Sequence, residues 1–135
     1  MDGLQYEHMV GEYLSSTGYT NVVVTKGSGD YGIDVLAEKE GRKFAVQCKY
    51  YQNPVGLSAV QEAVAGKAMY GCSDAMVVTN STFTKAARNL AQANQVTLLE
   101  HITEREIHNT YFQYDTSYIR WKQWKKEQRL KHLFF

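Results

Sequence analysis

Apolar and polar residues follow two spacings along this chain, one typical of helices and one typical of strands. In residues 4–19, apolar side chains repeat at helical intervals, which predicts a first helix that ends at Gly18. Short β-branched or apolar runs then predict three strands, at residues 21–25, 33–37 and 43–51. The polar segment between the second and third run indicates a tight hairpin.

The second half of the chain alternates helical and strand patterns. Pro54 interrupts the chain, and Ser58 followed three residues later by Gln61 predicts a capping box at the start of the next helix. The later predicted elements are a helix at 59–70, a strand at 75–79, a helix at 84–94, a strand at 96–100 and helices at 104–112 and 116–135. The order α-β-β-β-α-β-α-β, followed by C-terminal helices, predicts an α/β fold with a mixed sheet flanked by helices.

The predicted hairpin brings three polar side chains together. If the turn is the pair Glu40-Gly41, the numbers of directly opposed residues sum to 81, and Asp34 lies opposite Gln47. Lys49 points to the same face as Gln47 because side chains alternate along a strand. An acid, an amide and an amine are therefore expected to converge beside an apolar core.

Two interpretations of this cluster remain open from spacing alone. The first is a salt bridge and a hydrogen bond that close the edge of the core. The second is a Mg²⁺ site, because Mg²⁺ prefers oxygen ligands, and Asp34, the Gln47 side chain and the backbone carbonyl of Cys48 supply them. In that case Lys49 lies beside the attacking water and the phosphate, where it deprotonates or orients the water and offsets charge.

Charge is distributed unevenly, although the net charge is only +1. Residues 117–135 carry six Lys or Arg against the single acid Glu127, so the rest of the chain is acidic overall. We predict a catalytic domain at 1–114 and a basic aromatic helix at 115–135 that packs on it or extends it. DNA-backbone contacts are predicted for four residues of that helix: Lys122, Lys125, Lys126 and Arg129. Its aromatic residues favour packing, on the body or on a second subunit, and a basic amphipathic helix also suits a membrane surface.

Composition narrows the class of protein. The chain has 135 residues with 44% hydrophobic content and one proline, as expected for one globular domain. The two cysteines, Cys48 and Cys72, form neither a disulfide framework nor a zinc motif. The sequence shows neither a signal peptide nor a transmembrane run, so we expect a cytoplasmic protein without membrane contact. We also expect no small-molecule cofactor.

Several stretches in order resemble the catalytic domain of Mrr-type restriction endonucleases, within the PD-(D/E)xK nucleases that carry glutamine before the lysine. The matching stretches are YEHMVGEYLSSTGY, GSGDYGIDVLAE, FAVQCKYY, PVGLSAVQEAV and VVTNSTFTKAARNLA. The resemblance implies a restriction-endonuclease-like fold and divalent metal. It also implies that Asp34 and Glu7 bind the metal, that Gln47 occupies the variant acid position and that Lys49 is the catalytic lysine. Asp30 and Gln61 are expected to shape the site.

The function predicted from the sequence is a type II-like endonuclease of the restriction or defence kind. It would use Mg²⁺, with Mn²⁺ as a substitute, to hydrolyse phosphodiester bonds in DNA, and cutting both strands favours a homodimer. One alternative is a structure-selective nuclease such as a Holliday junction resolvase. The other is a nucleic-acid-binding module without catalysis, which the uncharged Gln47 favours.

Overall fold

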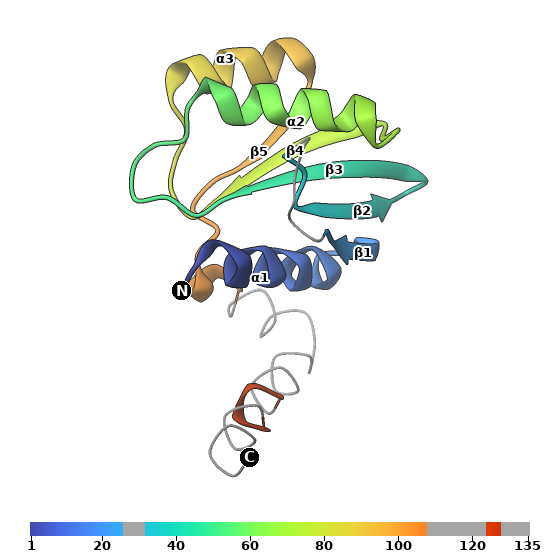
Figure 1. The fold of residues 1–135 in the computed structure, drawn as a ribbon, viewed down its shortest axis with the longest axis vertical. Coiled ribbons are helices and arrows are strands. Elements are labelled where there is room, and N and C mark those ends of the chain that lie inside the picture. The colour runs from blue at the N-terminus through green and yellow to red at the C-terminus, as the bar shows by residue number, and fades with distance from the viewer. Residues whose placement is uncertain (26–31, 108–123, 128–135) are drawn as a thin grey trace.

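The computed structural model describes residues 1–25, 32–107 and 124–127 (Figure 1). The named elements are α1 (Gly3–Ser16), β1 (Thr20–Val24), β2 (Val35–Lys39), β3 (Arg42–Lys49), α2 (Leu57–Met69), β4 (Asp74–Thr79), α3 (Lys85–Asn94) and β5 (Thr97–Leu99). This order confirms the predicted α-β-β-β-α-β-α-β. Of the predicted C-terminal helices, residues 104–107 and 124–127 are helical, and the remainder lie outside the described residues.

The five strands form one mixed sheet in the order β1-β2-β3-β4-β5. The pairs β1–β2 and β2–β3 are antiparallel, whereas β3–β4 and β4–β5 are parallel. The β2–β3 register runs from Val35 opposite Val46 to Lys39 opposite Arg42, which confirms the predicted sum of 81. The turn residue Glu40 has a φ of 53° and the following glycine a φ of 77°, as a two-residue type I′ hairpin requires.

Helices cover both faces of the sheet. In Figure 1 α1 lies below the sheet, and α2 and α3 lie above it. Side chains such as Val10 and Leu14 of α1 pack against Val46 and the buried Cys48 of β3. On the other face, residues such as Val60 of α2 pack in a second apolar cluster. The alternation along β3 therefore sends its even-numbered residues toward α1 and its odd-numbered ones toward α2.

The helix starts differ in how they are capped. The carboxylate of Asp2 accepts a hydrogen bond from the amide of Gln5 at 2.8 Å, and the Gln5 side chain accepts one from the amide of Asp2 at 2.9 Å. This capping box starts α1. The capping box predicted at Ser58 is wrong, because α2 already begins at Leu57 after Gly56, and Gly56 offers no side chain to cap it.

The chain is tied down where it leaves β3 and β4. The side chain of Asn80 accepts a hydrogen bond from the amide of Tyr51 at 2.8 Å and donates one to its carbonyl at 2.9 Å. Val55 forms a bridge with Phe83, through backbone hydrogen bonds of 2.8 and 3.0 Å. These bonds hold the carboxyl end of β3, which carries Lys49, against the loop that follows β4.

Two composition-based expectations can be compared with the described part of the chain. Both Cys48 and Cys72 are free thiols, as predicted. Within residues 1–25, 32–107 and 124–127, no helix combines the length and apolar character needed to cross a bilayer.

Candidate active site

The odd-numbered face of β3 brings two polar side chains to one acceptor on α2. Gln47 is only 4% exposed, and its amide nitrogen Nε2 donates a hydrogen bond to Oε2 of Glu62 at 2.9 Å. Lys49 Nζ donates to the same oxygen at 3.2 Å, and the Lys49 side chain is 16% exposed. One carboxylate therefore accepts hydrogen bonds from the buried Gln47 amide and from the partly buried Lys49 ammonium.

Asp34 lies one residue before β2 and connects the hairpin to the site. Its backbone amide donates to the carbonyl of Val46 at 2.9 Å, which extends the ladder of β2 and β3 by one bond. Its carboxylate oxygen Oδ2 accepts a hydrogen bond from the amide of Cys48 at 2.8 Å. The other carboxylate oxygen of Asp34, Oδ1, is not used in this hydrogen bond. The structure thus brings Asp34 beside the stretch of β3 that carries Gln47 and Lys49.

Glu7 of α1 completes the cluster from the opposite helical layer. The carboxyl groups of Glu7 and Asp34 lie close enough to form a side-chain hydrogen bond when one of them is protonated. Burial, together with the charge and hydrogen bond of Asp34, raises the pKa of Glu7 to about 7. Burial also raises the pKa of Asp34, although the Cys48 amide, Glu7 and Lys49 oppose that rise. Both neighbouring carboxyl groups therefore bind a proton more readily than an ordinary surface acid.

Two buried oxygens in this cluster have no hydrogen-bond partner among the described residues. They are Oε2 of Glu7 and Oε1 of Gln47. No described group of three His, Cys, Asp or Glu side chains has the geometry of a metal site. The donors at hand are instead two carboxylates and one amide oxygen, the hard oxygen ligands that suit Mg²⁺ or Mn²⁺. We call Glu7, Asp34 and Gln47 the candidate metal site, and its residues fit a divalent cation.

Lys49 is held as a cation. Burial lowers its pKa, but the hydrogen bond and charge of Glu62, together with Tyr51, outweigh burial and leave the pKa raised. Its Nζ also lies 5.8 Å from the centre of the Tyr51 ring, within cation–π range. A protonated Lys49 is suited to stabilise negative charge beside it.

Gly32 forms one wall of this cluster. Its φ is +66°, and a Cβ added there would lie 3.1 Å from Oε1 of Gln47 and 3.1 Å from Oε2 of Glu62. Any side chain at this position would displace those two groups. The predicted site-shaping residue Asp30 lies outside the described residues.

The second predicted site-shaping residue, Gln61, is exposed, and the contact with β3 comes from its neighbour Glu62. Sequence reasoning missed this role of Glu62. The signal that distinguishes them is the helical phase of α2. Residues Ala59, Ala63 and Gly66 face the sheet, Glu62 lies on the flank of that stripe, and Gln61 lies on the far side.

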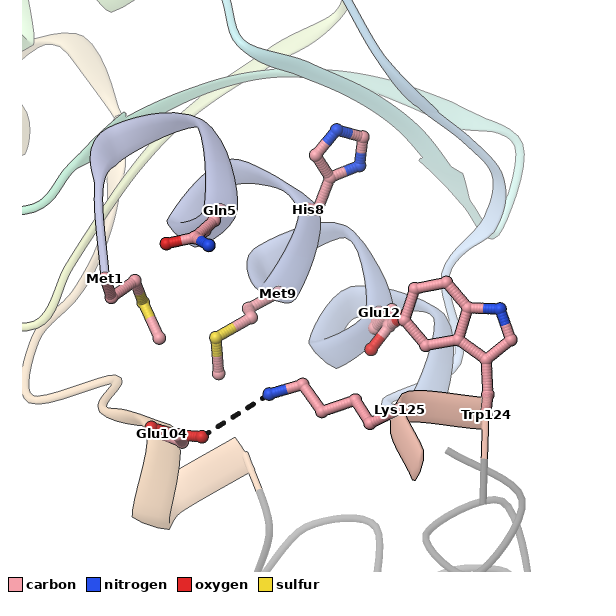
Figure 2. Close-up of a pocket in the computed structure, with 8 residues that line it drawn as sticks. All are labelled: Met1, Gln5, His8, Met9, Glu12, Glu104, Trp124 and Lys125. Carbon is pink, nitrogen blue, oxygen red and sulfur yellow. Dashed lines mark ion pairs between the residues drawn. The ribbon is translucent and has the colours of Figure 1, made fainter. Parts of the chain in front are cut away.

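Of the four lysines and arginines predicted to contact DNA, two lie in the described residues. Lys125 forms an ion pair with Glu104 at 3.6 Å, and Lys126 is exposed. Figure 2 shows Lys125 and Trp124 on the outer side of α1, where they line a pocket of about 660 Å³. Trp124 is 52% exposed, and the other tail aromatics predicted to pack lie outside the described residues. Lys122 and Arg129 lie outside the described residues.

The mixed sheet with its helices is a restriction-endonuclease-like α/β fold, shared with two solved nuclease structures. One is the MspJI restriction endonuclease in complex with a 27-mer oligonucleotide, with a TM-score of 0.63 and 18% identity over 82% of this chain and 28% of that one. The other is a repair endonuclease from Pyrococcus abyssi, with a TM-score of 0.56 and 16% identity over 74% of this chain and 46% of that one.

The sequence profile of the Mrr catalytic domain, described as a restriction endonuclease, matches residues 1–104. The chain therefore belongs to this family, which confirms the resemblance predicted from its motifs. An uncharacterised protein of Archaeoglobus fulgidus is 30% identical over 78 residues, which are 53% of this chain and 44% of that protein. The chain spans less than half the length of this relative and of the two nucleases.

Proposed function

We propose that this domain is a metal-dependent DNA endonuclease that hydrolyses phosphodiester bonds, with Mg²⁺ as its ion and Mn²⁺ as a substitute. The observation that carries the proposal is the cluster itself. The carboxyl groups of Glu7 and Asp34 lie together beside the start of β2 and the end of β3, and both have raised pKa values. Gln47 has a buried oxygen without a partner among the described residues, and Lys49 is held by Glu62 close by.

Burial raises the pKa of both acids of the candidate metal site, and a cation bound beside them would favour their charged forms. Oε2 of Glu7 and Oε1 of Gln47, which lack partners among the described residues, would be available to coordinate such a cation. When bound, such an ion would polarise the phosphate group of the DNA and lower the pKa of the attacking water. The backbone carbonyl of Cys48 remains a predicted third type of ligand.

The protein's own contribution to the reaction lies in charge and position. The Lys49 ammonium, fixed by Glu62 at 3.2 Å, offsets the negative charge that develops on the phosphate oxygens as water attacks the phosphorus atom. The amide of Cys48 holds the Asp34 carboxylate in one orientation through its 2.8 Å hydrogen bond. As the water oxygen bonds to phosphorus it loses a proton to solvent, the bond between phosphorus and the 3′ oxygen breaks, and the 3′ oxygen takes a proton from solvent.

Support for DNA as the substrate comes from the family and from the solved neighbours. The chain belongs to a restriction endonuclease family, and MspJI is solved with a 27-mer oligonucleotide. Lys126 is exposed on the described part of the tail, and we propose that it and the neighbouring tail cations attract the DNA backbone. Cleavage of both strands requires two sites, so we propose a homodimer on the substrate.

Plasmid nicking with purified protein tests this function. We expect Mg²⁺ or Mn²⁺ to support nicking and a chelator to stop it. Lys49→Ala should reduce the rate roughly a hundredfold to a thousandfold, as loss of one charge-stabilising donor does elsewhere. Arg42→Ala, at the other end of β3, is the matched control and should cut at the parental rate. Equal rates in the parent and in Lys49→Ala would refute the assignment.

A second function is favoured by one observation, the uncharged amide at position 47. A nucleic-acid-binding module without catalysis predicts DNA binding but no nicking with either metal. A four-way junction compared with linear duplex of the same sequence then decides between a junction resolvase and a duplex endonuclease.

A further inference from the structure

Glu62 makes contacts that no predicted role explains. It lies on the flank of α2 with 42% of its side chain exposed, yet one of its oxygens accepts hydrogen bonds from the buried Gln47 and the partly buried Lys49 of β3. An ordinary helical glutamate lies free in solvent. This carboxylate instead reaches the residue at the variant acid position and the predicted catalytic lysine at once.

An amide can present either its oxygen or its nitrogen to a ligand, and only the oxygen binds a metal ion. The hydrogen bond from Gln47 Nε2 to Glu62 uses the nitrogen end. The planar amide then points Oε1 elsewhere, and Oε1 is the buried oxygen without a described partner. A carboxylate accepts hydrogen bonds and cannot donate them, so Glu62 selects one of the two amide orientations.

Gly32 encloses the same pair from the other side. The space where its Cβ would lie is within 3.1 Å of both Gln47 Oε1 and Glu62 Oε2. The amide and the carboxylate are therefore held between a backbone wall and β3, with little room for a different rotamer.

We propose that Glu62 is a positioning residue for the candidate metal site. It orients the Gln47 amide so that Oε1 is the donor available to the cation, and it holds Lys49 Nζ on the same oxygen. Gln47 carries no negative charge, but Glu62, which accepts its hydrogen bond, provides one next to it. This inference rests on the proposed metal-dependent function, because it assigns Glu62 a role within that same site.

A double-mutant cycle with Mn²⁺ calorimetry tests whether Glu62 acts through Gln47. Glu62→Ala should weaken Mn²⁺ binding about tenfold in the parent, the scale of one charge-assisted hydrogen bond. In a Gln47→Ala background the same change should have less than about a twofold effect. An equal loss in both backgrounds would mean that Glu62 binds the metal or acts by charge alone, and would overturn the proposal. Glu40→Gln, which removes a charge at the distant hairpin turn, should leave Mn²⁺ affinity unchanged.

The amide signals of Gln47 test the same contact in metal-free protein. By NMR, Glu62→Ala should shift the Gln47 side-chain N–H signals and speed their hydrogen exchange about tenfold or more. Glu62→Leu, which has a similar length but no acceptor, serves if Glu62→Ala does not fold, and should act in the same direction. Unchanged signals would overturn the proposal. A parent protein that binds no Mn²⁺ would instead refute the proposed function, whatever the amide signals show.

Kinetics separate positioning from simple support of the fold. At saturating Mn²⁺, Glu62→Ala should lower kcat for DNA cleavage about tenfold because Lys49 loses its anchor, and KM for DNA should stay within about twofold. A change in KM alone, or no change in either constant, would contradict a positioning role.

Discussion

The two ends of β3 carry polar clusters of opposite character. At its start, the Arg42 guanidinium donates two hydrogen bonds to Asp74, at 2.6 and 3.0 Å, and the pair is open to solvent. At its end, the acids Glu7 and Asp34 face each other, and two buried oxygens of Glu7 and Gln47 lack described partners. The strand is the same, but among the described residues only the first cluster finds partners for all its buried polar atoms.

The acids of the two clusters show this difference most clearly. The hydrogen bond from Arg42 holds the pKa of Asp74 below its ordinary value. Burial and a neighbouring carboxyl raise the pKa of Glu7 to about 7. An acid that the fold pairs with a cation stabilises the fold, whereas an acid that the fold pairs with another acid is suited to bind a ligand.

The largest expected effect is on metal affinity, which a substitution at the end of β3 should reduce and the same substitution at its start should not. Asp34→Asn keeps an oxygen for the Cys48 amide but removes a charge from the candidate metal site. We expect calorimetry to show Mn²⁺ binding at least about a hundredfold weaker, since even outer partners of metal sites are worth roughly 10- to 100-fold. Asp74→Asn removes the same charge at the other end of β3. Equal losses of affinity in both variants would refute the site assignment.

Exchange of the Gln47 and Glu62 side chains should affect stability next most strongly. Gln47→Glu alone places two carboxylates where an amide now donates at 2.9 Å, and should lower the free energy of unfolding by about 1–3 kcal/mol. Adding Glu62→Gln re-forms the hydrogen bond with donor and acceptor exchanged and should restore stability. Denaturant unfolding of the metal-free protein at pH 8 measures both. If the double variant is no more stable than Gln47→Glu alone, the hydrogen bond between positions 47 and 62 does not contribute to the stability of the fold.

The carboxyl pair also predicts how stability depends on pH. The pKa of Glu7 is about 7 in the folded protein and has an ordinary value of 4.5, so the folded state binds more protons between these values. The free energy of unfolding of metal-free protein should therefore fall as pH rises from 4.5 to 7, by about 1–2 kcal/mol once solvent screening is allowed for. Thermal melts check the slope, which should flatten in Glu7→Gln. A slope that persists in that variant would assign it to other groups.

The smallest effect is expected at the start of β3. Arg42→Ala removes an exposed ion pair and should lower the free energy of unfolding by less than about 1 kcal/mol. High salt should reduce the difference further. A loss of several kcal/mol in a denaturant titration would show that this pair is more important to the fold than its exposure suggests.

Local rules were enough to predict the hairpin from the sequence. Alternation fixed the strand faces, and Glu40-Gly41 fixed the register, because a two-residue turn with positive φ at both positions leaves one pairing. The element order followed from the same patterns. The family followed from several motifs in order rather than from any one of them.

The partners across the sheet could not be predicted in this way. Glu7 reaches Asp34 only because α1 packs on the opposite face from α2, and that placement is a tertiary effect. Gln61 and Glu62 lie about 100° apart around α2, and which of the two reaches β3 depends on how the helix packs on the sheet. The contact of Glu62 with β3 therefore became visible only in three dimensions.

Diffraction from crystals soaked in Mn²⁺ tests the central claim most directly, because the anomalous signal locates the ion without reference to activity. The account predicts a peak within bonding distance of the carboxylate of Asp34 and of Oε1 of Gln47, and no such peak in crystals of Asp34→Asn. An absent peak in the parent protein, or a peak bonded to other side chains only, would contradict it.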